Sequence, residues 1–225
     1  MNRKGYKSLI PKSAREVVDK CYPHGTKAES SFFVARKRVG RREWWDDGQL
    51  MSEWGLKDGK KHGNVLDFDP NGQLSFVEPY RNGRPHGKAT QFASDGSVLI
   101  CYIMQDGVGL DLWCQGDGKL SEERYCPADG ELGYTRWWNC DNKSIHSEQS
   151  WLNSSGWHGI LREWNTGERL RRGFPQFYVK GQRVSKKQYC RACESDSLLP
   201  QYIPEKDQPF RNLPPEYLAQ MKSRS

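Results

Sequence analysis

Residues 68 to 87 read FDPNGQLSFVEPYRNGRPHG, a stretch with two turn dipeptides and a closing His-Gly pair. The dipeptides Asn71-Gly72 and Asn82-Gly83 are typical of β-hairpins, because Asn and Gly accept the positive φ angles of a type I′ turn. The closing pair, His86-Gly87, has an earlier counterpart in His62-Gly63. Catalysis seldom needs the same dipeptide twice, so this recurrence indicates architecture.

Glycines recur along the chain at a step of about 24 residues, which indicates an internal repeat. The first slot follows a His or an apolar residue and comprises Gly63, Gly87, Gly109, Gly133 and Gly159, preceded in three cases by His62, His86 and His158. The second slot comprises Gly48, Gly72, Gly96, Gly118, Asn142 and Gly167. The third slot comprises Asp58-Gly59, Asn82-Gly83, Asp106-Gly107, Asp129-Gly130 and Ser155-Gly156. We expect type I′ turns at the second slot and links between hairpins at the third.

One aromatic residue precedes each second-slot turn by three to five positions, and this set comprises Trp45, Phe68, Phe92, Trp113, Trp138 and Trp164. Each aromatic side chain buries roughly 150 to 250 Å², so a ladder of them can hold a sheet together in a chain that is only 35% hydrophobic. The sequence therefore predicts an all-β repeat over residues 31 to 181. We expect an elongated single-layer antiparallel meander of about six hairpins.

The two ends of the chain carry helix signals. Ser13 and Glu16 form the pattern of a capping box, which predicts a short helix over residues 13 to 20, within a basic segment of residues 1 to 30. Ser185 and Gln188 repeat the pattern at the start of a C-terminal segment of residues 182 to 225. Its predicted parts are a helix at 185 to 193, a Pro-rich extended strap at 194 to 213, and a last helix at 215 to 222.

The unit pattern resembles a known family. The stretches WWDDGQLMSE, FDPNGQLSFVEPYRNGRPHG and REWNTGERL share W-x-x-(D/N)-G-x-L-x-x-E and Y-x-(N/D)-G-x-x-H-G elements. They resemble the MORN-repeat variant of bacterial antitoxin components over about two-thirds of the chain. The resemblance implies a curved sheet of hairpins that binds proteins or, in some members, membrane lipids. The chain departs from the pattern at Val108-Gly109, Leu132-Gly133 and Asp141-Asn142, so the central units are expected to present a different surface.

The distribution of charge and the apolar content limit which compartments and partners are expected. Residues 1–42 carry twelve Lys/Arg against three acids, residues 43–159 ten against eighteen, and residues 160–225 thirteen against seven. An acidic middle between basic ends is not the continuous basic face of a general nucleic-acid binder. No export signal or membrane span is expected, and the seven scattered cysteines are typical of reduced thiols. These features together predict a cytoplasmic protein.

The histidines of the first slot are interpreted as structural, each hydrogen-bonding a neighbouring backbone or stacking on an aromatic ring, with ligand contact and catalysis as alternatives. The sequence contains no nucleophile elbow, HExxH, P-loop or dinucleotide fingerprint. We therefore expect no enzyme activity, no cofactor and no small-molecule substrate. Cys190 and Cys193 have metal-like or redox-like spacing, but no second ligand pair lies near them in sequence, so two packed small side chains are the favoured interpretation.

A basic stretch, RKRVGRR at residues 36 to 42, is expected on the first strand of the array, with Arg36 and Arg38 on one face and Lys37 on the other. It is either a solvated strand or a docking site for an acidic partner, a phosphate backbone or a lipid surface. The residues expected to bind a partner are its five basic side chains and six aromatic anchors: Arg36, Lys37, Arg38, Arg41, Arg42, Trp44, Trp54, Tyr80, Tyr102, Trp137 and Trp151.

The sequence as a whole predicts a non-enzymatic repeat scaffold that binds another protein. The antitoxin resemblance implies that this partner is a toxin whose active or docking surface becomes covered. The alternative is a peripheral module that binds anionic lipid or nucleic acid through residues 36 to 42, in which case binding weakens steeply with salt.

Overall fold

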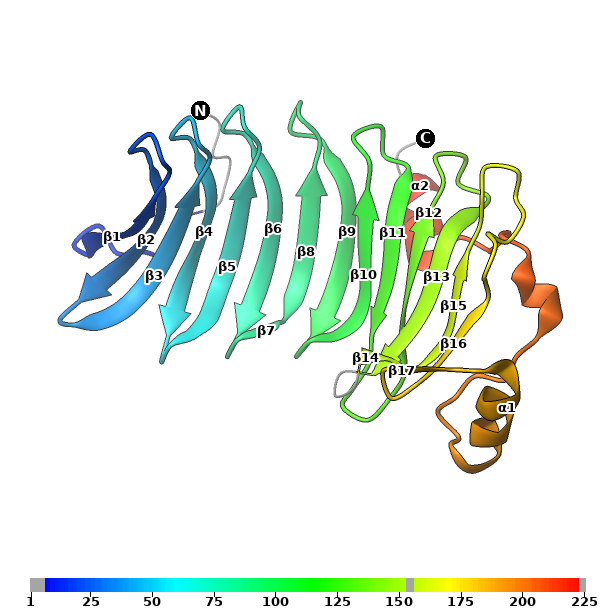
Figure 1. The fold of residues 1–225 in the computed structure, drawn as a ribbon. Coiled ribbons are helices and arrows are strands. Elements are labelled where there is room, and N and C mark those ends of the chain that lie inside the picture. The colour runs from blue at the N-terminus through cyan, green and yellow to red at the C-terminus, as the bar shows by residue number, and fades with distance from the viewer. Residues whose placement is uncertain (1–6, 153–155, 223–225) are drawn as a thin grey trace. The chain divides into compact units, whose positions relative to one another are not determined.

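A computed structural model describes residues 7–152 and 156–222 of the 225-residue chain. The chain divides into two compact units, residues 1–107 and 108–225. In both units the described residues form antiparallel strands in an open single layer, with helices only near the C-terminus (Figure 1). The predicted all-β class is therefore confirmed.

Among its described residues, the first unit contains nine strands. Each pairs antiparallel with the strand before it, except that β8 pairs with β6, which also pairs with the short β7. Their bounds are β1 Arg15–Cys21, β2 Lys27–Val34, β3 Lys37–Trp44, β4 Leu50–Lys57, β5 Lys60–Phe68, β6 Leu74–Arg81, β7 Arg84–Pro85, β8 Gly87–Phe92 and β9 Val98–Gln105.

The second unit has the same antiparallel arrangement and ends in the helical segments. The strands are β10 Val108–Cys114, β11 Leu120–Cys126, β12 Gly133–Trp138, β13 Ile145–Leu152, β14 Gly156–Trp157, β15 Gly159–Glu163, β16 Gln176–Val179 and β17 Gln182–Val184. The helices are α1 Lys186–Ser195, the short 3₁₀ helix η1 Pro204–Asp207, and α2 Pro215–Lys222.

The predicted helix at residues 13 to 20 is wrong, because β1 occupies Arg15–Cys21 and pairs with β2. Val17 and Val18 are β-branched, and the cross-strand partners on β2 outweigh a local capping pattern.

The C-terminal helices are confirmed. Ser185 accepts a hydrogen bond from the Gln188 amide and completes the capping box of α1. The segment between α1 and α2 is mostly irregular, as the strap prediction requires, with η1 inside it.

Two kinds of turn alternate along the sheet, and type I′ turns lie at the third slot in the first unit, at Asp58-Gly59, Asn82-Gly83 and Asp106-Gly107. Asp58 and Gly59 both have positive φ, at 51° and 76°, as a type I′ turn requires. At the second slot Gly48 alone is left-handed, with φ of 85°, and its amide donates to the Trp45 carbonyl at 3.0 Å. This is a three-residue loop with a left-handed closing residue, so the type I′ assignment for the second slot is wrong.

The last two second-slot turns replace the left-handed glycine. Asn142 occupies it with φ of 54°, which the short polar side chain tolerates. In the last hairpin repeat the loop begins at Asn165, so the left-handed residue is Glu168, with φ of 62°. Gly167 has an ordinary φ. The expected turn at Ser155-Gly156 involves Ser155, which lies outside the described residues.

The buried ladder sits at the last strand position before each three-residue loop. Its members are Trp44, Phe68, Phe92, Cys114, Trp138 and Trp164, each buried or half-buried. Trp45 and Trp113 are therefore wrong as ladder members. Each lies one residue away from the buried position, and neighbouring strand residues face opposite sides of a sheet. The burial of Trp44 also removes it from the exposed anchors predicted for a partner.

At the first glycine slot, side chains from other segments approach the glycine backbone closely. The ring of Trp151 lies where a Gly133 side chain would be, with Cζ2 only 2.7 Å from an ideal Cβ. Leu9 similarly fills the space beside Gly63. Glycine at this slot therefore makes room for side chains that cover the sheet.

Substitution of Gly133 by Ala is expected to lower the free energy of unfolding by about 1–3 kcal/mol, because the methyl group overlaps the Trp151 ring. Gly116→Ala is the matched control, since its Cβ would meet nothing within 4 Å and neither glycine has a left-handed φ. Urea denaturation of both variants measures the difference. Equal losses in the two would contradict the close-approach argument.

Candidate interaction surface

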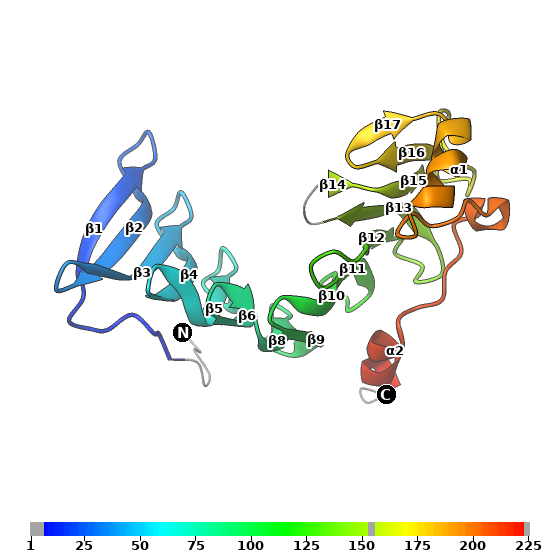
Figure 2. The same ribbon diagram turned by 90° about the horizontal axis from the view of Figure 1, so that it is seen from below.

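In the first unit, the segment before β1 covers one face of the sheet. Ile10 is buried and packs with Phe32 and Trp44. Leu9 lies beside Gly55 and Gly63. Figure 2 shows this N-terminal segment running along one side of β1 to β4. We call this side of the sheet the covered face, and the opposite side the open face.

In the second unit, residues 185–222 form the cover. Tyr189 and Cys193 of α1 pack against Ile160 and Phe177 of the sheet. Farther along, the Tyr217 hydroxyl of α2 donates to the Gly118 carbonyl at 3.0 Å. The terminal segment thus buries the covered face of this unit from its last strands back to the loop before β11.

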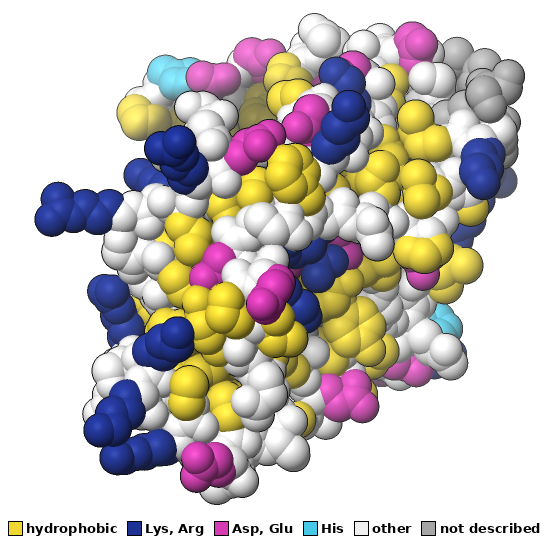
Figure 3. All heavy atoms as spheres, turned by 90° about the vertical axis from the view of Figure 1, so that its right-hand side faces the viewer, with side chains coloured by type: hydrophobic (Ala, Val, Ile, Leu, Met, Phe, Trp, Pro, Cys, Tyr) yellow, Lys and Arg dark blue, Asp and Glu magenta, His cyan; other side chains and the backbone are white. Residues whose placement is uncertain are grey.

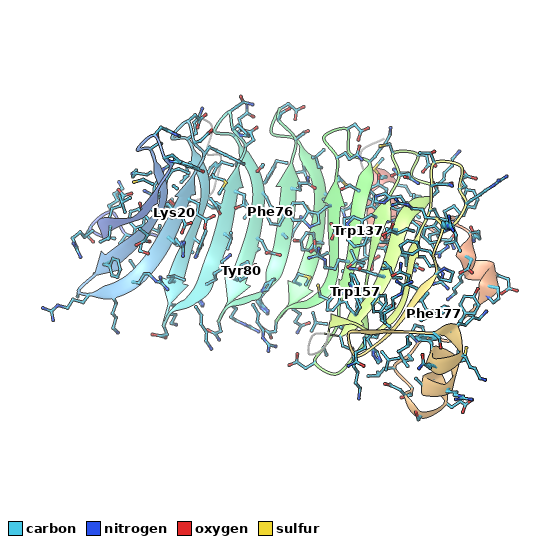
Figure 4. All side chains as sticks on the ribbon, viewed as in Figure 1. Lys20, Phe76, Tyr80, Trp137, Trp157 and Phe177 are labelled. Atoms are coloured by element: carbon cyan, nitrogen blue, oxygen red, sulfur yellow. The ribbon has the colours of Figure 1, made fainter. Side chains whose placement is uncertain are left out.

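The open face of the first unit carries a cluster of aromatic rings and cations. Arg41 follows Gly40, whose missing side chain faces Ile10 on the covered face, so Arg41 and its cross-strand partner Trp54 face the other way. Lys61 Nζ lies 4.6 Å from the Trp54 ring centroid and 5.1 Å from that of Tyr80. Arg41 lies 5.9 Å from the Trp54 centroid. We call Arg41, Trp54, Lys61 and Tyr80 the Trp54 cluster; Figure 4 labels Tyr80.

The open face of the second unit carries two of the tryptophans predicted as anchors. Arg136 bonds acids on the covered face, so its neighbour Trp137 lies on the open face. The Trp151 indole donates to Thr135 Oγ1 at 3.2 Å, which holds its ring over Gly133. Figure 4 labels Trp137 and a third ring, Trp157.

A shallow hollow of about 340 Å³ adjoins Trp137 in this unit. Its other lining residues are His146, Ser147, Glu163, Trp164 and Arg171. Arg171 Nη1 donates to Glu163 Oε2 at 2.9 Å, so the charges beside the ring are paired. The hollow offers an apolar ring with a polar border, which is the composition of many binding contacts between proteins.

The predicted basic strand divides into two groups. Arg36 lies in the turn before β3 with a left-handed φ of 66°, so its placement on a strand face is wrong. Lys37 and Arg38 begin β3 and are exposed. Arg41 and Arg42 are paired instead, Arg41 with Glu29 and Arg42 with Glu53 at 2.7 Å. Only three of the five basic residues therefore present uncompensated charge.

Two of the six predicted anchors are buried. Trp44 is 7% exposed, and Tyr102 is 5% exposed and donates through its hydroxyl to Glu78 at 3.0 Å. Neither side chain is available to a partner. The remaining four, Trp54, Tyr80, Trp137 and Trp151, are half-buried. The structure brings Arg41, Trp54 and Tyr80 into one cluster, around a lysine that the sequence pattern did not single out.

Lys61 and Trp157 are the main residues that sequence reasoning missed. Lys61 precedes the first-slot dipeptide, and its contact with Trp54 follows only from the register of β4 with β5, which contains a bulge. Trp157 precedes the last first-slot histidine and packs its ring against Tyr178, with centroids 4.7 Å apart. Its position directly before the repeated His-Gly dipeptide is the sequence signal that could have identified it.

The first-slot histidines act as acceptors for turn amides. His86 Nδ1 accepts from the Asp106 amide at 3.2 Å, and His158 Nδ1 accepts from the Lys180 amide at 3.0 Å. Asp106 and Lys180 each open a two-residue turn with two positive φ angles. The hydrogen bond to a neighbouring backbone that the structural interpretation expects is thus present for these two. His62 Nδ1 is buried without a hydrogen-bond partner among the described residues.

The Cys190 and Cys193 pair lies on α1. Cys193 is buried beside Tyr189 and Leu199, and burial raises the pKa of its thiol, whereas Cys190 is exposed. The packing interpretation holds for one of the two. Over residues 7–152 and 156–222, no group of three or more His, Cys, Asp or Glu side chains has the arrangement of metal ligands.

No family model matches this chain, and no curated protein matches it. Within the described parts of the chain, every helix is too short or too polar to cross a bilayer.

Stability of the second unit is expected to fall as pH drops below about 6.5, because burial lowers the pKa of His158 and outweighs the opposing effect of Asp196. The unfolded chain, with the ordinary His pKa of 6.5, takes up the proton first, so the free energy of unfolding is lost as pH falls toward the folded pKa. Urea titrations at a series of pH values test this. His158→Gln should flatten the dependence between pH 7 and pH 5 relative to wild type, and an unchanged slope would contradict it.

Proposed function

We propose that the chain is a non-enzymatic repeat scaffold whose open face binds a protein partner. The supporting observation is that half-buried aromatic side chains lie on the uncovered side of each unit. Terminal segments cover part of the opposite side of each unit. A single-layer sheet has two faces to bury, and here the chain supplies a cover for only one of them.

The Trp54 cluster has the composition of an energetic centre for binding. Trp, Tyr and Arg dominate such centres, because they combine large apolar area with directional polar contacts. Arg41 and Lys61 already lie against the Trp54 ring, so the ring and its cations are ordered before a partner arrives. Preordered side chains lose less conformational entropy on binding.

Acidic hairpin loops near the middle of the chain also support binding of a protein partner. Asp95 Oδ1 accepts from the Ser97 amide at 2.8 Å, and Asp117 Oδ1 from the Lys119 amide at 3.1 Å. The bonds from Ser97 and Lys119 lower the pKa of these carboxyls, so they stay ionised. Fixed carboxylates at hairpin ends in each unit favour a partner with a basic surface.

The finer proposal is that this is a MORN-type array in the cytoplasm that neutralises its partner, as the resemblance to bacterial antitoxin components implies. Covering the partner's active or docking surface is the mechanism. Its specific test is co-expression: a partner that arrests growth alone should lose that effect when this chain is present. Continued arrest with the two proteins bound would contradict the antitoxin form and leave the scaffold proposal standing.

Trp54→Ala is expected to weaken partner binding by at least about tenfold, the effect typical of an energetic centre. Ile103→Ala is the matched control, since Ile103 is a 71% exposed apolar side chain that follows open-face Tyr102 and so faces the other way. Affinity purification with the intact wild-type chain supplies the partner, and calorimetry with the purified pair gives the affinities. Equal loss in both variants, or no loss in Trp54→Ala, would contradict open-face binding.

A second candidate function rests on Arg36, Lys37 and Arg38, which are exposed and form no ion pair with any described residue. Three clustered cations favour a phosphate-rich surface, either anionic lipid or nucleic acid. Neutralising all three should abolish cosedimentation with phosphatidylserine vesicles and retention on DNA. Binding that persists unchanged from low to high salt would contradict this candidate, because phosphate contacts weaken steeply with salt.

A further inference from the structure

The second unit contains a larger cavity on its covered face, where the strap between α1 and α2 crosses the sheet. Its volume is about 530 Å³. The lining residues are Tyr134, Arg136, Glu148, Ser150, Ile160 and Arg162 from the sheet, and Pro200, Gln201, Lys206, Gln208, Phe210, Arg211 and Asn212 from the strap. Figure 3 views this side of the second unit and shows basic and acidic side chains close together among hydrophobic ones.

A row of alternating charges crosses the sheet here, and its members Arg136, Glu148 and Arg162 form the floor of this cavity. The cross-strand pairs are Glu123 with Arg136, Arg136 with Glu148, and Glu148 with Arg162. Arg136 Nε donates to Glu148 Oε2 at 2.9 Å, and Arg162 Nη1 approaches Glu148 Oε1 at 3.4 Å. Arg211 of the strap closes over Glu148, with donor distances of 3.1 Å to each carboxylate oxygen. One carboxylate thus holds three guanidinium groups together.

The balance of charge in this cavity is positive. Four cations line it, and Glu148 is the one lining acid; Glu123 and Asp207 lie outside the lining and pair with Arg136 and Arg162. Lys206 forms no ion pair with any residue that the structure describes. Burial alone would raise the pKa of Glu148, yet Arg211 and Arg136 lower it to about 2. The low pKa of this buried carboxyl follows from the guanidinium groups that surround it.

Hydrogen-bond donors also remain unused. Arg162 is 4% exposed, and its Nη2 has no acceptor among the described residues. A buried guanidinium nitrogen without an acceptor is costly, because its hydration is lost and not replaced. Among the described residues, the acids beside Arg136 accept from its Nε and Nη1 and not from its Nη2. An acceptor group in the cavity would lie beside Arg136 and Arg162, whose guanidinium donors are not all used.

We propose that this cavity binds a small organic anion, with its carboxylate or phosphate group among Arg136, Arg162 and Lys206 and its apolar body against Tyr134, Ile160 and Phe210. Guanidinium groups suit both head groups because their planar donors match two oxygens at once. The volume exceeds that of a bare phosphate and lies in the range of small-molecule sites. Phe210, at 47% exposure, gives the body an apolar contact at the cavity wall.

This site is separate from the open face, since its floor consists of residues that point to the opposite side of the sheet. Glu148 and Arg162 connect the strap to the strands through Arg211 and Asp207. An anion that binds here should therefore also stabilise the docking of the strap. Failure of the proposed scaffold function would leave this inference intact, and its own failure would leave the scaffold proposal intact.

The experiment is calorimetry on the intact chain with four probes: phenyl phosphate, benzoate, inorganic phosphate and neutral phenol. Phenyl phosphate or benzoate should bind with a dissociation constant of about 1 mM or tighter, and phenol should not bind. The phosphate and carboxylate arms distinguish the two head groups. Absence of binding by both aromatic anions up to about 10 mM would overturn the site.

Three variants locate the binding. Lys206→Gln should weaken each bound anion about threefold to tenfold, as expected for loss of one charge-assisted contact near solvent. Phe210→Ala should weaken the aromatic anions and leave inorganic phosphate unchanged. Lys187→Gln, an exposed lysine of α1 outside the cavity, is the matched control and should have no effect. Equal weakening by Lys206→Gln and Lys187→Gln would show only diffuse attraction and would overturn the proposal.

Discussion

Positive φ angles at fixed positions are the constraint on which the rest of the structure depends. In the first unit, three two-residue turns of this kind pair an Asp or Asn with a glycine, as at Asp58-Gly59. A turn of this type fixes which residues of the two strands face each other. Because side chains alternate along a strand, a slip of one residue would exchange the covered and open faces. The turns therefore determine what each face presents.

The covered face depends on this constraint because its charged residues pair across strands. Arg42 and Glu53 are cross-strand partners in the first unit, and Arg136 and Glu148 are partners in the second. Each pair is partly or fully buried, and removing one member would leave an uncompensated buried charge, which costs far more than the pair contributes. The terminal segments complete this arrangement, since Arg211 supplies further donors to Glu148 from a distant part of the chain. Docking of the C-terminal strap and the pairing of Glu148 are thus coupled.

Local features of the sequence were sufficient to predict the β class, the positions of most turns and the C-terminal helices. The glycine spacing, the Asp-Gly and Asn-Gly dipeptides and the capping box at Ser185 each act within a few residues. The features that could not be predicted depend on register. Trp44 and Trp45 are adjacent, and only the bulge between Glu43 and Trp44 decides which of them is buried. The helix predicted over residues 13 to 20 failed for a related reason, because β2 supplied partners that a local pattern cannot show.

The cavity on the covered face of the second unit and the Trp54 cluster could not be predicted from the sequence for the same reason. Lys61 reaches Trp54 across a strand pair, and Arg211 reaches Glu148 from 63 positions away. Inter-strand nuclear Overhauser effects in solution test the register most directly. Backbone contacts that pair Trp54 with Val65 and Val65 with Glu78 are the expected result. Contacts shifted by one residue, pairing Trp54 with Leu66, would place these side chains on the wrong face and contradict the register.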